Sequence, residues 1–510
     1  MIKDEQRIYD FVIIGSGLGG LLCAYLLAER GHSVCILEQN VQFGGCLQIF
    51  SREKSVFDTG VHYIGELGEG ENLNRIFSYF GLMDRLNLEQ LDKDAFDVIS
   101  FRGDKTEYPW AQGHENFVQQ LAKLFPDEEA AIEKYANTLR TISDDFYAGG
   151  FIDLDLDFMN SEAMRTGAKE FIDSLTENEK LRDVLAGNIP TYAGVAEKTP
   201  LHQHALIINS YLKSAWRCVD GGAQIAKHLA IAIRAMGGVL LRRQEVVEIN
   251  AEEGSIRNVV TAEGDAFFAR KFIANIPPEK VLKMLKGVEL RKTYKNRLST
   301  QEPTASFFGL YVRFKSGAFP YHRRNFYHYN ESGVWDATHY SADEWPKSWL
   351  FYPAVSSVDG GFMATATILS YMDYEEMEPW VQTRNTTAQP ASRGEEYEAF
   401  KKRKAEKLID DVEKRFPGFR DSIESYYTST PLTYRDYLGV EKGAAYGKVK
   451  DFHQPHNAFI SPRSKVENLF FTGQHVHLHG IKGVTTTAIL TASVILDDPQ
   501  LFSTVLSGKG

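Results

Sequence analysis

The chain has 510 residues, of which 43% are hydrophobic and 25% are charged, and its formal net charge is −11. This length is too great for one small domain, and the apolar content supports a large buried core, so two lobes are expected. The acidic balance argues against nucleic acid as a partner, and the sequence holds no run of 18 apolar residues that would cross a bilayer.

Cysteine usage and the charge pattern bear on location. The four cysteines, at positions 23, 35, 46 and 218, show neither CxxC pairs nor the spacing of a small disulfide framework, which favours a reduced cytoplasmic protein. The polar N-terminus lacks the form of a secretory signal, and attachment to a membrane surface stays open. The basic run KKRK at 401–404 lies in a helical pattern and is predicted to be a solvated helix face. The most linker-like segment is 383–396.

The first predicted elements form a strand, a turn and a helix. A short apolar strand over 11–14 is followed by GSGLGG at 15–20 and by a helix over 21–30. Gly15 allows the tight turn, Gly17 leaves room for a pyrophosphate, and Gly20 lets helix and strand approach closely. A second strand over 33–37 ends at Glu38, whose carboxylate can accept hydrogen bonds from both ribose hydroxyls. This order predicts a dinucleotide-binding unit.

Several later segments carry a further signal. Gly44 and Gly45 in FGGCLQIF precede FDTGVHYIG at 57–65, and the segment 204–230 contains Gly221 and Gly222 at the start of a helix. A strand is expected over 246–249. STPLTYRDYLGVEKGAAYG covers 429–447, and NLFFTGQHVHLHGIKGVTTTAILTA covers 468–492, with a strand ending at Gly473, a glycine-bearing loop and a helix from near 483.

With these motifs, residues 9–495 resemble the FAD-dependent phytoene desaturase, carotenoid isomerase and retinol saturase group, which is related to the flavin amine oxidases. The resemblance implies an α/β fold in which a Rossmann-like FAD-binding domain of the glutathione-reductase and amine-oxidase type carries an inserted mixed α+β substrate domain. The FAD-binding domain is expected at 1–68, 216–289 and 436–510, and the substrate-binding domain at 69–215 and 290–435.

The resemblance also implies which residues hold FAD. They are Gly15, Ser16, Gly17, Gly19, Gly20, Glu38, Gln39, Gly44, Gly45, Cys46, Val246, Gly473, Gln474, Gly483, Val484 and Thr485. Cys46 stands where the desaturases and amine oxidases usually have Arg, and saturase-like members share this departure. It weakens the amine oxidase interpretation.

Three histidines alternate at 475, 477 and 479, and on a strand they would present three imidazoles to one metal ion. The resemblance places them in a flavin loop instead, so no metal is expected. His475 and His62 are the candidate proton donors, because an unperturbed pKa near 6.5 suits proton exchange at neutral pH. Lys482 is the candidate cation beside the reduced flavin. Loop packing of the histidines and solvent exposure of Lys482 are the alternatives.

The second lobe is expected to combine helices, clearest over 114–139, with strands such as 304–315. The aromatic-rich segment 323–353 is expected to wall an apolar tunnel or to form sheet core. Only one complete dinucleotide fingerprint is present, so the electron donor or acceptor is expected to be external.

We favour saturation of a conjugated C=C bond in a long apolar isoprenoid or polyene, retinoid-like or carotenoid-like, by hydride from flavin N5. The alternatives are a carotenoid desaturase or isomerase, a flavin amine oxidase, and a non-enzymatic relative that binds prenylated proteins, as Rab escort proteins do.

Overall fold

The first sheet is built on a β–α–β unit. In the computed structural model, which describes residues 7–148, 161–354, 361–457 and 459–508, β1 (Ile8–Ile14) leads through α1 (Leu18–Glu29) to the parallel strand β2 (Val34–Glu38). The predicted strand, turn and helix are confirmed, although α1 begins three residues earlier than expected. Its residues 18–28 are buried, because α10 (Ala223–Ala235) and α16 (Gly480–Leu496) pack against it.

This sheet has eight strands, in the order β10-β2-β1-β13-β12-β11-β14, with β20 beside β13. The further strands are β10 (Val239–Arg242), β11 (Val246–Glu252), β12 (Ser255–Thr261), β13 (Ala266–Ala274), β14 (Leu285–Lys286) and β20 (Leu469–Phe471). Strands β10, β2, β1, β13 and β20 run parallel. Ile14 lies opposite Leu37 and Ala274. The carboxyl ends of these strands therefore reach one edge, where a doubly wound sheet binds its ligand.

The second sheet has seven strands, in the order β19-β15-β18-β17-β16-β7-β8. They are β7 (Asp97–Phe101), β8 (Tyr108–Trp110), β15 (Ser306–Phe314), β16 (Asn325–Tyr329), β17 (Ser348–Pro353), β18 (Thr365–Met372) and β19 (Ile423–Ser429). Neighbours are antiparallel except β16 and β7. The strand predicted over 304–315 is confirmed as β15.

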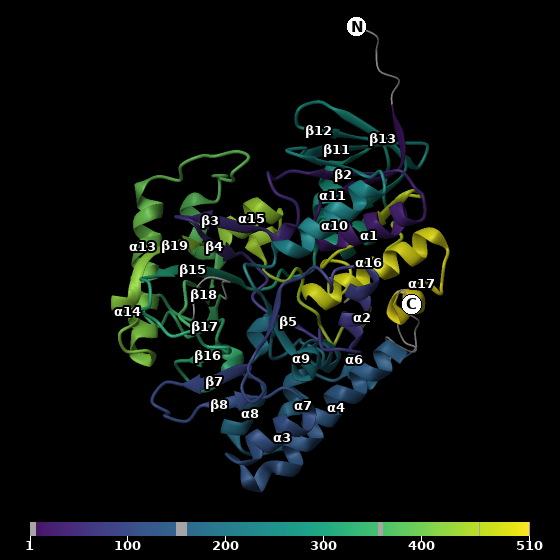
Figure 1. The fold of residues 1–510 in the computed structure, drawn as a ribbon. Coiled ribbons are helices and arrows are strands. Elements are labelled where there is room, and N and C mark those ends of the chain that lie inside the picture. The colour runs from purple at the N-terminus through teal and green to yellow at the C-terminus, as the bar shows by residue number, and fades with distance from the viewer. Residues whose placement is uncertain (1–6, 149–160, 355–360, 458, 509–510) are drawn as a thin grey trace.

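Helices cover both faces of this second sheet. One face packs on α13 (Glu395–Arg415), and the other packs on α3 (His114–Ala122), α4 (Glu129–Ala148), α8 (Glu179–Leu185) and α9 (Leu201–Lys213). Figure 1 shows α13 on the outer side of the strands and α3, α4 and α9 on another. The helical pattern over 114–139 is confirmed as α3 and α4, with the turn η2 (Pro126–Glu128) between them.

Short elements complete the described chain. Two small sheets consist of β3 (Ile49–Arg52) with β4 (Ser55–Asp58), and of β5 (Ile64–Gly65), β9 (Ala215–Cys218) and β6 (Leu88–Gln90). The remaining α-helices are α2 (Asn72–Tyr79), α6 (Glu162–Arg165), α7 (Ala168–Leu175), α11 (Pro278–Met284), α12 (Lys292–Ser299), α14 (Phe419–Ser422), α15 (Pro431–Leu438) and α17 (Leu501–Ser507). The other 3-10 turns are η1 (Gly45–Leu47), η3 (Ile189–Thr191), η4 (Val334–Asp336), η5 (Tyr374–Trp380), η6 (Glu441–Gly443) and η7 (Pro455–Asn457).

Two expectations about the surface need correction. The basic run 401–404 is only partly solvated, because Lys404 is buried, forms an ion pair with Glu376 at 2.5 Å and lies 4.3 Å from the ring centre of Trp345. The linker-like segment 383–396 is held in place: Arg393 forms a buried ion pair with Asp436 of α15.

The two sheets bear on the domain division. All strands of the first sheet fall within 1–68, 216–289 and 436–510, and all strands of the second fall within 69–215 and 290–435. The exact boundaries stay a prediction. In the part of the chain that the structure describes, no helix is both long enough and apolar enough to span a membrane.

Candidate functional site

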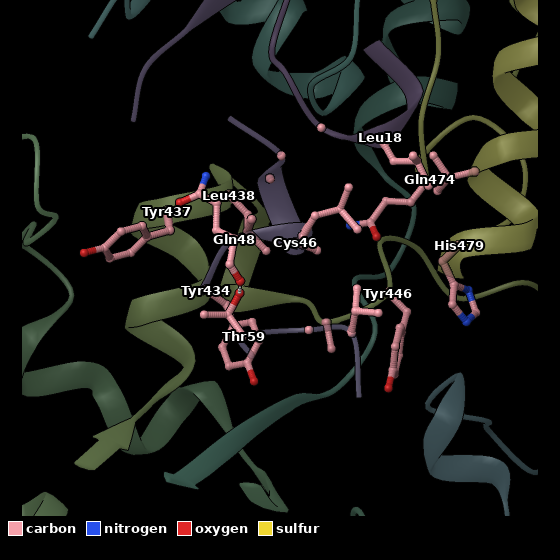
Figure 2. Close-up of a pocket in the computed structure, with 18 of the residues that line it drawn as sticks. Leu18, Cys46, Gln48, Thr59, Tyr434, Tyr437, Leu438, Tyr446, Gln474 and His479 are labelled. Carbon is pink, nitrogen blue, oxygen red and sulfur yellow. Dashed lines mark hydrogen bonds between the residues drawn. The ribbon is translucent and has the colours of Figure 1, made fainter. Parts of the chain in front are cut away.

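A cavity of about 910 Å³ is lined by elements of both sheets. The first sheet contributes the carboxyl ends of β1 and β2, and the second contributes residues of β15, β17, β18 and β19. In the close-up of Figure 2, Leu18 and Gln474 lie in the upper part of the view, Tyr434 and Tyr446 lie in the lower part, and Cys46 lies between them. The volume falls in the range that holds a cofactor or drug-sized ligand.

Most of the residues predicted to hold the cofactor line this cavity. They are Gly15, Gly17, Gly19, Glu38, Gln39, Gly44, Gly45, Cys46, Val246, Gly473, Gln474, Gly483 and Val484. Among the described residues of that prediction, Ser16, Gly20 and Thr485 do not line it. Ser16 and Thr485 are buried behind it, and Gly20 lies inside α1.

The glycine turn after β1 closes around Asn275, a residue that the sequence did not single out. Gly15 adopts a φ of +93°, which favours glycine, and its carbonyl accepts a hydrogen bond from Asn275 Nδ2 at 3.3 Å. A β-carbon added at Gly17 would lie 2.9 Å from this amide nitrogen. A β-carbon added at Gly19 would lie 2.8 Å from Asn275 Oδ1, and one added at Gly473 would lie 2.5 Å from the same atom. The carboxamide therefore lies between two backbone segments, the turn at 15–19 and the one at 473, that only glycine allows so close.

This geometry refines the reasons given for two glycines. A β-carbon at Gly17 would meet Asn275 first, so the space that we assigned to a phosphate is in part the space of a side chain. A β-carbon at Gly20 would lie 2.3 Å from the carbonyl oxygen of Gly15, which confirms that Gly20 allows close packing of helix and strand.

Glu38 is oriented by the turn that it faces. Its Oε2 accepts hydrogen bonds from the backbone N–H of Ser16 at 3.0 Å and from Ser16 Oγ at 2.5 Å, and its Oε1 accepts one from the N–H of Asn40 at 2.8 Å. Glu38 is buried yet lines the cavity, so its carboxylate is fixed at the end of β2.

The Gly44–Gly45 pair lies against the first glycine turn. Gly17 and Gly44 form an isolated parallel bridge, and a β-carbon at Gly45 would lie 3.1 Å from Gly17 Cα. Burial raises the pKa of the Cys46 thiol to about 11, so this position presents a neutral group at neutral pH. The four cysteines are free thiols.

These residues fit an FAD. The cradle offers glycine backbone, the start of the 12-residue helix α1 for the phosphates and the fixed carboxylate of Glu38 for a ribose. The start of the 17-residue helix α16 lines the same cavity and would favour negative charge on a reduced flavin.

The three alternating histidines lie on a turn, not on a strand, and they do not share one face. His475 and His479 line the cavity, whereas His477 packs on Phe459 with ring centres 4.0 Å apart. Within the described residues, no group of three or more His, Cys, Asp or Glu side chains is arranged to hold a metal ion.

The protonation argument for the histidines is wrong. Burial lowers the pKa of His475 to about 3 and that of His479 to about 4, and nearby lysines add to the effect. His62 lines the cavity and stacks on Tyr352 with ring centres 4.5 Å apart. Burial, with Arg217 nearby, lowers the pKa of His62 to about 3. His475 and His62 are therefore neutral at neutral pH, and their proposed role as proton donors stays untested.

Lys482 is not exposed to solvent. It lies in the first turn of α16, which begins at Gly480 and not near Gly483, and it lines the cavity. Its ammonium forms an ion pair with the fully buried carboxylate of Glu66 and lies 4.3 Å from the ring centre of Tyr147.

The sequence analysis named Cys46 and the histidines but missed three other polar groups. Asn275 organises the glycine turns, Glu66 pairs with Lys482, and Asp97 is fully buried in β7 with a hydrogen bond from Tyr63 Oη at 3.1 Å. Of these, only Asp97 offered a local signal, because a carboxylate stands at the start of the apolar run DVISF.

Comparison with known proteins agrees with this geometry. Residues 18–496 match the family described as flavin containing amine oxidoreductase. The all-trans-retinol 13,14-reductase of Rattus norvegicus is 28% identical over 96% of this chain and 85% of its own length. A chloroplastic prolycopene isomerase of an Oncidium hybrid is 25% identical over 86% of this chain and 75% of its own.

A solved structure shows the same fold. The cyclohexylamine oxidase of Brevibacterium oxydans superposes with a TM-score of 0.60 at 14% identity, covering 98% of this chain and 99% of that one. Because the family match spans nearly the whole chain and the cavity fits FAD, this FAD-dependent oxidoreductase belongs to the flavin-containing amine oxidoreductase family.

Proposed function

We propose that this enzyme saturates a conjugated C=C bond of a long apolar polyene of retinoid or carotenoid type. The observation that carries the proposal is the composition of the cavity beyond the cofactor cradle. Its walls there are largely aromatic and aliphatic, with Phe50, Phe307, Tyr311, Leu369, Tyr434 and Tyr446 among the lining residues. Such walls suit a long hydrocarbon, and the match to the retinol reductase supports this substrate class.

The protein positions the substrate, and the cofactor supplies the reducing equivalents. FAD, when bound and reduced, provides hydride for one carbon of the double bond. The aromatic walls would hold the polyene against the cofactor and exclude water from it, and holding the reactants in contact supplies much of the rate gain. Cys46, His62 and His475 are neutral at neutral pH, so these three positions offer no negative charge to an ammonium group, and amine oxidation is less well supported.

Isomerisation is the second candidate, because a prolycopene isomerase matches 86% of the chain. The same cavity also suits desaturation, which runs the steps in reverse with oxidised flavin. Neither alternative changes the cofactor site.

One anaerobic experiment separates these reactions. Protein reduced beforehand is mixed with a panel of retinoids, carotenoids and isoprenoid lipids, and the products are analysed by mass. Saturation predicts that a polyene reoxidises the flavin and gains two hydrogens. Dehydrogenation of a saturated isoprenoid by oxidised enzyme would reverse the direction, and an isomer of unchanged mass would favour the second candidate. Protein that purifies without flavin would indicate a binding protein instead.

We further infer an external electron donor, because one dinucleotide fingerprint is present, and a cytoplasmic location, because the four cysteines are free. The acidic net charge gives no support to nucleic acid binding. Peripheral contact with a membrane would give an apolar substrate a short route to the cavity.

A further inference from the structure

A chain of hydrogen bonds runs from a buried carboxyl group to the wall of the cavity. Tyr63 Oη lies 3.1 Å from Asp97 Oδ2 and 2.7 Å from Tyr327 Oη, and Tyr327 Oη lies 3.2 Å from Tyr352 Oη. Tyr63 and Tyr352 line the cavity, whereas Asp97 is fully buried. Four oxygen atoms from three strands and one loop are thus linked in series.

The registers of the second sheet explain this alignment. Side chains two residues apart on a strand share a face, so Asn325 and Tyr327 of β16 point the same way. Asn325 lies opposite Asp97 on the parallel strand β7, and Tyr327 lies opposite Leu350 of β17, two residues before Tyr352. The face of the sheet that packs on α3, α4, α8 and α9 therefore carries these hydrogen bonds, and the opposite face packs on α13.

Two amides hold the carboxyl group at the inner end of the chain. Asn188 Nδ2 donates to Asp97 Oδ2 at 2.5 Å, and Asn325 Nδ2 donates to Asp97 Oδ1 at 2.7 Å. Asn325 Oδ1 in turn accepts a hydrogen bond from Arg217 Nη2 at 2.6 Å. Burial nevertheless dominates and raises the pKa of Asp97 to about 7, so the group holds a proton at mildly acidic pH.

The tyrosines cannot donate a proton without being reprotonated by Asp97. Burial raises the pKa of Tyr63, Tyr327 and Tyr352 well above the usual value, so a lone phenolate in this wall would be costly. When Asp97 is protonated, it can donate to Tyr63, which then donates to Tyr327, which donates to Tyr352. The last hydroxyl hydrogen is then directed to the cavity, and a proton leaving Tyr352 is replaced from behind.

We propose that Tyr352 is the proton donor to the substrate and that Asp97 resupplies it through Tyr63 and Tyr327. This inference rests on the proposed function. The role of proton donor, which the sequence analysis gave to His475 and His62, passes to this series of hydroxyl groups. Tyr352, against which His62 stacks, is then the catalytic residue.

The atoms balance in this scheme. Reduced FAD, when bound, would supply the hydride for the first new C–H bond as the π bond breaks. The Tyr352 O–H bond breaks as its proton forms the second C–H bond. One proton shifts along each link, so Tyr352, Tyr327 and Tyr63 end neutral and Asp97 ends as a carboxylate. Its two amide donors stabilise that anion until solvent returns the proton.

Isosteric variants test each link. Tyr352→Phe and Tyr327→Phe remove one hydroxyl each, and Tyr329→Phe is the matched control. Tyr329 is a buried residue of β16 whose hydroxyl donates to the carbonyl of Gly187 at 2.7 Å, and it is not among the described residues that line the cavity. The reaction is reoxidation of prereduced enzyme by a polyene in a single anaerobic turnover, in H₂O and in D₂O.

We expect Tyr352→Phe to slow product formation by about 10² to 10⁴-fold, with FAD content and polyene affinity unchanged. Wild type should show a solvent isotope effect that curves with the D₂O fraction, because several protons move together. Tyr327→Phe should turn this dependence linear, and Tyr329→Phe should match wild type. Unaltered turnover in Tyr352→Phe, or equal behaviour of Tyr327→Phe and Tyr329→Phe, would overturn the proposal.

A second measurement does not depend on turnover. Infrared spectra at pH 6 should show the C=O stretch of a protonated carboxylic acid, which Asp97→Asn lacks and Tyr63→Phe shifts. Absence of this band would show that Asp97 is not protonated and would contradict the proposal. If no polyene reoxidises wild-type enzyme but the band is present, the proposed function fails while the hydrogen-bonded reservoir stands.

Discussion

The ammonium of Lys482 and the carboxylate of Glu66 form an ion pair closed to solvent beside the candidate flavin cavity. Glu66 is fully buried and the Lys482 side chain is 11% exposed. A cation in the first turn of a helix opposes the helix dipole, and this carboxylate offsets the penalty. Lys213 Nζ lies 3.0 Å from the other carboxylate oxygen. Burial opposes ionisation of Glu66, but the two lysines outweigh it and hold its pKa below the usual value.

This trio should tune the flavin. Lys213 is also paired with Asp144 at 3.5 Å, so the charges are considered one by one: the ammonium of Lys482, which lines the cavity, would stabilise a reduced, anionic cofactor, and the carboxylate of Glu66 would oppose it. Lys482→Met should therefore lower the midpoint potential of bound FAD, and Glu66→Gln should raise it. One charge acting over about 7 Å at an effective dielectric constant near 20 gives about 2 kcal/mol, which corresponds to tens of millivolts for two electrons. Anaerobic titration against reference dyes measures both shifts.

The exposed Lys407 of α13 provides the control for that titration. Lys407→Met removes one positive charge far from α16 and should leave the potential within error of wild type. Shifts of equal sign in Lys482→Met and Glu66→Gln would contradict the electrostatic role. A Lys482→Met shift no larger than that of Lys407→Met would do so as well.

The glycine turn gives a prediction about cofactor content. Valine at position 17 would place its β-carbon 2.9 Å from Asn275 Nδ2 and displace the carboxamide that lies between the turn at 15–19 and Gly473. Gly17→Val should therefore fold, as judged by circular dichroism, but purify with little FAD.

Gly31→Ala is the control for this loss, because a β-carbon there meets nothing within 4 Å, although its φ of +82° adds some strain. It should retain full FAD. A normally folded Gly17→Val protein with wild-type FAD content would show that the cradle is assigned wrongly.

Local patterns were enough to predict the core of the cofactor site. The order of β1, the glycine turn, α1 and β2 is encoded within residues 8–38, and Glu38 follows from the end of β2. The parallel register then brings Glu38 to the edge where Gly15 begins the turn, since the N–H of Gly15 donates to the carbonyl of Leu37. These relationships depend on neighbours in the sequence.

The remaining parts of the site depend on distant segments. Glu66 reaches Lys482, and Tyr63 links Asp97 to Tyr327, only when segments far apart in the sequence have folded together, so no local spacing predicts either contact. The ionisation of His475 was misjudged for the same reason, because its pKa is set by burial and not by its own residue type. Lys404 was also misjudged, because its run of charges predicts exposure to solvent, whereas Glu376 and Trp345, which are distant in the sequence, hold it in a buried position.

The histidine turn leads to a prediction about metals. His475 and His479 line the cavity while His477 packs on Phe459, so the three imidazoles do not converge on one ion. Elemental analysis of purified protein should find no stoichiometric metal, and addition of Zn²⁺ or Fe²⁺ should not raise its thermal stability. A bound metal that is lost when all three histidines are changed to Ala would contradict this.

Asp97 makes stability depend on pH in an unusual direction. The titratable and charged groups that face it are Tyr63, Tyr211, Tyr327, Tyr352 and, through Asn325, Arg217. Its pKa rises from 3.8 to about 7 on folding, chiefly because of burial. Between these values the folded chain binds more protons than the unfolded chain, so this group makes the protein less stable as pH rises through that window.

Asp97→Asn removes this dependence. Relative to the variant, wild type should lose as much as about 4 kcal/mol of unfolding free energy between pH 4 and pH 7. Asp104→Asn is the control, because the pKa of Asp104 shifts in the opposite direction. Burial works against ionisation there, but hydrogen bonds from Thr106 and Tyr108 hold the pKa of Asp104 low. The contribution of Asp104 to the unfolding free energy is therefore lost only as the pH falls. Denaturant unfolding of the three proteins at several pH values measures the slopes. Parallel profiles for wild type and Asp97→Asn would show that Asp97 is ionised throughout, and it could not then hold the proton that Tyr352 delivers.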